Sequence, residues 1–96
     1  MSADNGIVML KSPKASGGCE YRVREVHALD NMYARNDSRR LDSKIVVAAF
    51  AQCPVLDEEA AKKAAADLKR EINASGQIVE FGIIQLLAAE PFPVQP

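Results

Sequence analysis

The sequence contains no tryptophan, only 5% aromatic residues, a single histidine and two cysteines among its 96 residues. His27 could activate Cys19 or Cys53 as a nucleophile only with a cleft and an orienting group, and the sequence identifies neither. We therefore expect a structural or surface histidine. Two cysteines with no metal-ligand spacing form neither a disulfide framework nor a zinc site, so we expect free thiols.

The sequence also lacks a large excess of charge of either sign, and it lacks long apolar runs. The net charge is −1, whereas proteins that bind duplex DNA usually present a strongly basic face; duplex DNA is therefore not an expected partner. No apolar run reaches the roughly 18 residues of a membrane span, and Met1 to Asn5 does not read as a signal peptide. We expect a protein of the host-cell cytoplasm without membrane contact.

Motifs that would indicate a reaction are missing as well. The sequence contains no Walker loop, dinucleotide-binding fingerprint, zinc-ligand spacing or catalytic-triad signature. We therefore predict that the protein is not an enzyme and binds no cofactor and no metal.

The strongest folding signals lie between Lys44 and Leu87. The apolar run from Ile45 to Ala51 predicts a strand buried on both faces. Asp57 can cap an alanine-rich helix that follows it, and Gly76 supplies the left-handed residue that commonly ends one. A second apolar run, Ile78 to Leu87, predicts a strand parallel to the first.

The first half of the chain predicts a hairpin and a short helix. Ile7 to Lys11 and Glu20 to Val26 read as antiparallel strands joined by a loop rich in glycine. Leu29, Met32 and Tyr33 share one face of a possible short helix. The polar segment from Ala34 to Ser43 lacks periodicity and predicts a mobile loop.

Together these elements predict an α+β fold of order ββαβαβ, with a four-stranded mixed sheet and two helices on one face. Residues 1–88 would form one domain, and the proline-rich residues 89–96 a flexible tail unless Phe92 docks. The last predicted strand is apolar on both sides. Two helices on one face of the sheet would leave its other side uncovered. We therefore expect a homodimer through the uncovered face or a strand edge.

Basic residues mark the candidate binding site for a partner or an anion. Planar guanidinium groups on a loop can hold phosphate or carboxylate with two hydrogen bonds each; the alternative is that these side chains are simply solvated. The candidate residues are Arg22, Arg24, Arg35, Arg39, Arg40 and Lys44.

Four short motifs occur in a characteristic order. They are Asp4-Asn5-Gly6-Ile7, Tyr21-Arg22-Val23, Ala28-Leu29-Asp30-Asn31 and Glu80-Phe81-Gly82-Ile83. In this order they resemble small proteins of unknown function encoded by tailed phages and prophages, although that group has tyrosine where Phe81 stands here. The resemblance implies a phage context, in which small accessory proteins often bind and block a host protein.

Two functions are thus expected. The first is a non-enzymatic phage accessory protein that inhibits a host defence component, as anti-CRISPR proteins do. The alternative is a protein that binds an anionic nucleotide or second messenger through the arginine-bearing loop.

Overall fold

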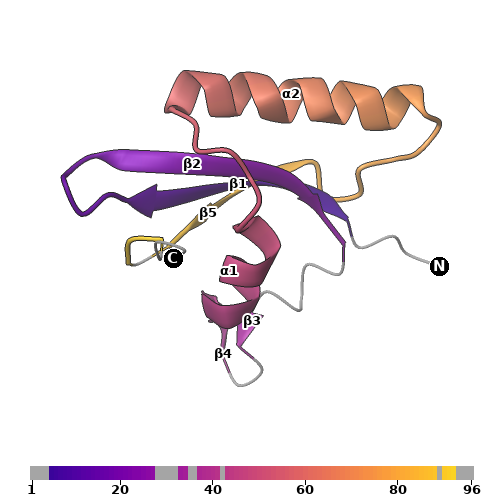
Figure 1. The fold of residues 1–96 in the computed structure, drawn as a ribbon. Helices are drawn as coiled ribbons and strands as arrows, with labels where there is room; N and C mark the ends of the chain where they lie inside the picture. Colours follow the sequence, from indigo (N-terminus) through magenta and orange to yellow (C-terminus); the bar gives the residue numbers. More distant parts are fainter. Residues whose placement is uncertain (1–4, 28–32, 35–36, 42, 89, 93–96) are drawn as a thin grey trace.

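The computed structural model describes residues 5–27, 33–34, 37–41, 43–88 and 90–92 (Figure 1). It confirms an α+β fold with a mixed sheet and two helices, but the mixed sheet has three strands. The elements in chain order are β1 (Gly6–Pro13), β2 (Cys19–Val26), β3 (Tyr33–Ala34), β4 (Asp37–Leu41), α1 (Ser43–Phe50), α2 (Glu58–Ala74) and β5 (Ile83–Leu87).

The main sheet has the strand order β2-β1-β5. β1 and β2 form the predicted antiparallel hairpin, with Gly6 opposite Val26 and Pro13 opposite Cys19. β5 returns to the other side of β1 and runs parallel to it. The first apolar segment of the chain is therefore the central strand of the sheet.

The two helices cover opposite faces of this sheet, so the prediction that both lie on one face is wrong (Figure 1). Val8 and Leu10 of β1 pack with α1, whereas Ile7 and Met9 pack with α2. Since successive strand residues point to opposite faces, a central strand covered on both sides must be apolar at every position. The four residues Ile7 to Leu10 meet this requirement and are all buried.

The segment Ile45 to Ala51 is not a strand, because residues 43–50 form helix α1. Val46 and Phe50, four residues apart, are both buried against the sheet. A short apolar run fits a buried strand or a buried helix equally well. The choice was decided here by tertiary packing, since β1 already occupies the centre of the sheet.

Helix α2 begins and ends where the sequence predicts. The Asp57 side chain accepts a hydrogen bond of 2.8 Å from the Ala60 N–H, and Gly76 follows the helix with φ 89°. Ala61, Ala65 and Ile72 form its buried stripe. On its exposed surface, Lys62 lies 3.0 Å from the Glu58 carboxylate and Lys63 lies 3.7 Å from the Asp67 carboxylate.

The final strand is shorter than predicted. Residues 78–82 form an irregular segment that ends in Gly82 with φ 65°, and β5 begins only at Ile83. Its partner is β1 rather than the segment 45–51. The predicted four-stranded sheet and the order ββαβαβ are therefore not confirmed.

A second, two-stranded sheet is formed by β3 and β4. β4 lies within the segment from Ala34 to Ser43 that the sequence predicted as a mobile loop. Tyr33, expected on a short helix, belongs to β3. The rest of that expected helix, including Leu29 and Met32, lies outside the described residues.

Candidate functional site

Two of the six predicted basic site residues have described side chains, and both are in contact with the fold. Arg22 is 8% exposed, and its guanidinium lies over the Phe92 ring at 3.8 Å from the ring centroid. Its Nη1 is 3.4 Å from the Glu20 carboxylate, but this buried atom makes no hydrogen bond. Phe92 therefore docks on the α1 side of the sheet.

Arg24 lies two residues further along the same face of β2. Its Nε donates to the Glu25 carbonyl at 3.1 Å, and its Nη1 donates to the Ala49 carbonyl near the end of α1. Arg24 thus satisfies a carbonyl at the helix C-terminus, where a positive charge is favourable. These two hydrogen bonds give Arg24 a structural role in joining β2 to α1.

The remaining predicted site residues cannot be placed as side chains. Arg35 lies outside the described residues. Arg39 and Arg40 belong to β4 and Lys44 to α1, but only their backbone is described. The arginine-bearing binding site for a nucleotide therefore stays a prediction.

The structure describes the side chains of both cysteines and of His27. Cys19 is exposed, and both cysteines are free thiols. Burial raises the pKa of Cys53, while the nearby Arg24 and Arg22 oppose that shift. The His27 Nε2 lies 3.6 Å from the Glu25 carboxylate, and the side chain is 69% exposed. These positions agree with the expected free thiols and surface histidine.

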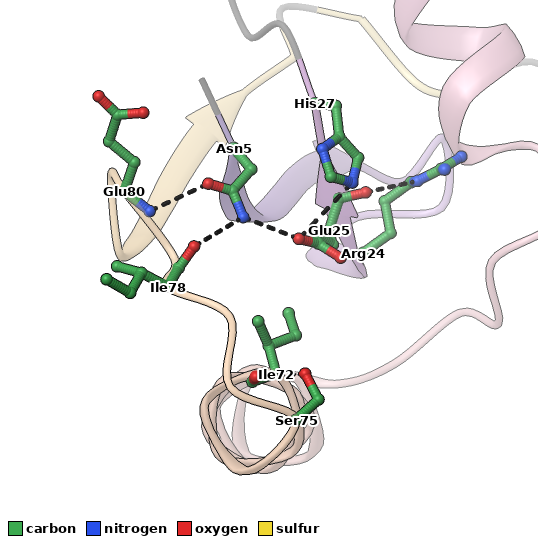
Figure 2. A network of polar contacts seen from close by, with 8 residues as sticks. All are labelled: Asn5, Arg24, Glu25, His27, Ile72, Ser75, Ile78 and Glu80. Carbon is green, nitrogen blue, oxygen red and sulfur yellow. Dashed lines mark hydrogen bonds and ion pairs between the residues drawn. The ribbon is translucent and has the colours of Figure 1, made fainter. Parts of the chain in front are cut away.

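Asn5 is the polar residue that the sequence did not single out as structural. It is 2% exposed, and its side-chain amide makes three hydrogen bonds (Figure 2). Nδ2 donates to Glu25 Oε2 at 2.9 Å and to the Ile78 carbonyl at 3.1 Å. Oδ1 accepts from the Glu80 N–H at 3.1 Å. Asn5 therefore links the start of β1 to β2 and to the segment before β5.

The segment held by Asn5 leads into an exposed apolar surface. Four large apolar side chains between residues 78 and 87 are solvent-exposed, and we call them the apolar strip. Its members are Ile78 at 77%, Phe81 at 48%, Ile83 at 43% and Leu87 at 64% exposure. The alternating pattern of this segment was visible in the sequence, but its exposure was not.

The exposure of Ile83 and Leu87 follows from where α2 lies. The core cluster beneath α2 contains residues of β1 and β2 but none of β5. In contrast, Ile84 and Leu86, which point to the other face, pack into the cluster with α1. One face of β5 is thus covered and the other is open.

The outer edge of β5 has no strand partner in the described part of the chain. Within the described residues β5 pairs with β1 alone, and its sequence IIQLL contains no charged residue. The opposite edge of the sheet is protected, because Tyr21 of β2 exchanges backbone hydrogen bonds of 2.9 and 2.8 Å with Leu56. Edge strands usually carry charges, prolines or bulges that block pairing, and β5 carries none of these.

Comparisons with protein-family models, curated proteins and solved structures find no match to this chain. Among the described residues, neither helix is long and apolar enough to cross a membrane. The same part of the chain contains no group of three or more potential metal ligands.

Proposed function

We propose that this chain is a non-enzymatic phage or prophage accessory protein that binds and inhibits a host protein, such as a defence or CRISPR component. The phage context comes from the order of the four short motifs. The mode of action, binding through a surface, is supported by the apolar strip. The proposed contact consists of its side chains on the open face of β5 and in the segment before it.

The apolar strip carries this proposal because large apolar side chains are costly to expose together. Of the five exposed large hydrophobic residues in the described part, four lie within residues 78–87 and only Val55 lies elsewhere. Exposed large apolar residues concentrated in one short segment favour a site where another protein binds. The host protein should present an apolar patch, since the strip itself contains no charge.

The proposal is tested with a tagged chain in a lysate of the natural host. The captured protein is identified, purified and titrated against wild type and against Ile78→Asp. Ile78 is the most exposed member of the strip, so its replacement should leave the fold intact. A buried carboxylate at an apolar contact should weaken binding by at least about tenfold.

Val55→Asp is the matched control, because Val55 is 55% exposed and adjoins Leu56 at the opposite edge of the sheet. This variant should bind the host protein as wild type does. Equal binding by Ile78→Asp and wild type would contradict the proposed surface, and turnover of a substrate would contradict the proposed mode of action.

A further inference from the structure

We infer that the open edge of β5 pairs with β5 of a second copy of this chain, antiparallel and across a twofold axis at Gln85. The inference deepens the proposed function and rests on it: the side chains of the apolar strip face the host protein, whereas the backbone edge of the same strand takes a second copy.

The hydrogen bonds between β1 and β5 show which backbone groups remain available. The Ile7 N–H donates to the Gly82 carbonyl at 2.8 Å, and the Ala88 N–H donates to the Lys11 carbonyl at 2.9 Å. In a parallel ladder, alternate residues direct their N–H and C=O groups to the partner strand. The backbone N–H and C=O groups of the even-numbered β5 residues therefore point to β1. Those of Ile83, Gln85 and Leu87 point outward, away from β1.

The antiparallel register that pairs the most of these outward groups has its axis at Gln85. Gln85 would stand opposite Gln85 of the second copy, and Ile83 opposite Leu87 of the second copy. In this register each facing pair consists of outward-directed residues, so both can exchange N–H to C=O hydrogen bonds. Pairing by any odd shift would oppose an outward residue to one whose groups are already bonded to β1.

A second copy is favoured as the occupant because the edge is self-complementary in composition. β5 is uncharged from Ile83 to Leu87, so two copies approach without repulsion. Facing Ile83 and Leu87 side chains would form an apolar cross-strand pair on either side of the axis. β2 cannot take this role, since Leu56 occupies its edge at Tyr21.

Pairing would join two copies of the three-stranded sheet into one continuous sheet. Strand side chains stand roughly perpendicular to the sheet, so edge pairing leaves their open face uncovered. The exposed sides of two β5 strands would then adjoin, and the exposed apolar surface formed by Ile83 and Leu87 would double in width. One strand on each side is a small contact, so we expect a weak, concentration-dependent dimer.

The test measures molecular mass by sedimentation for wild type, Gln85→Lys and Gln85→Glu. Wild type should rise from the monomer mass of 10.4 kDa towards twice that value as its concentration increases. Each variant alone should remain monomeric, because like charges would face each other at the axis. An equimolar mixture of the two variants should dimerise again. Thermal unfolding of each variant at low concentration checks that it is folded.

A wild-type chain that stays monomeric at millimolar concentration would overturn the inference, as would a mixture that fails to associate. The two proposals fail separately. A monomeric wild type that still binds the host protein removes only the dimer. A dimeric Ile78→Asp variant that binds the host protein as tightly as wild type removes only the apolar strip as the host-binding surface, and a dimeric wild type that captures no host protein removes only the proposed function.

Discussion

At the scale of single residues, Asn5 connects segments that are far apart in the sequence. Its two amide hydrogens and its oxygen all have partners, on Glu25, Ile78 and Glu80. In addition, its own carbonyl accepts a 3.0 Å hydrogen bond from the Phe81 N–H. A buried amide satisfied in this way holds the apolar segment in place, and its removal takes away three partly buried hydrogen bonds at once.

Replacing Asn5 by alanine should lower the free energy of unfolding by roughly 2–4 kcal/mol, because several hydrogen bonds are lost together. Urea unfolding measures this change. Asn73→Ala is the matched control: Asn73 is exposed on α2, so its replacement should change stability by less than about 0.5 kcal/mol. If Asn5→Ala were as stable as the control, the structural role of Asn5 would be wrong.

Gly82 determines where β5 begins. Its φ of 65° is in the left-handed region, and a Cβ at this position would meet no atom within 4 Å. Gly82→Ala should therefore cost about 1–2 kcal/mol through backbone strain alone. Gly82→Asn should cost less, since asparagine tolerates this conformation better. Thermal or urea unfolding compares the two, and an equal loss for both would argue against strain as the cause.

At the scale of elements, local signals predicted some parts of the fold and tertiary packing decided the rest. α2 was predictable because its cap, its alanine stripe and its terminal glycine are all local. The hairpin of β1 and β2 was predictable for the same reason. α1 was not, because its apolar run contains no local signal that separates a buried helix from a buried strand. Its packing against Val8 and Leu10 is a long-range property.

The candidate site, too, could be predicted from the sequence only in part. Alternation in the last segment identified Ile83 and Leu87 as neighbours on one face, but the sequence could not show that α2 leaves this face open. A homodimer was expected because one sheet face was predicted to lack a helix; this prediction is wrong, since each face carries a helix. Within the described residues, only one face and one edge of β5 are uncovered. Arg22, predicted to bind a partner, stacks on Phe92, and its binding role stays a prediction.

At the scale of the whole molecule, the two edges of the sheet differ in kind. One edge, β2, carries four charged residues and is bonded to Leu56. The other, β5, is uncharged and ends a sheet whose two faces are already packed with helices. The proposed association through the β5 side would therefore need no rearrangement of the core.

The proposed pairing of β5 with a second copy is tested most directly by hydrogen exchange at single amides of β5 as a function of protein concentration. The amides of Ile83, Gln85 and Leu87 should exchange rapidly in dilute solution and slow down as the concentration rises, because the second copy then bonds them. The amides of Ile84 and Leu86, already paired with β1, should change much less. Equal and concentration-independent exchange at Ile83, Gln85 and Leu87 would contradict the assignment of β5 as the edge that associates.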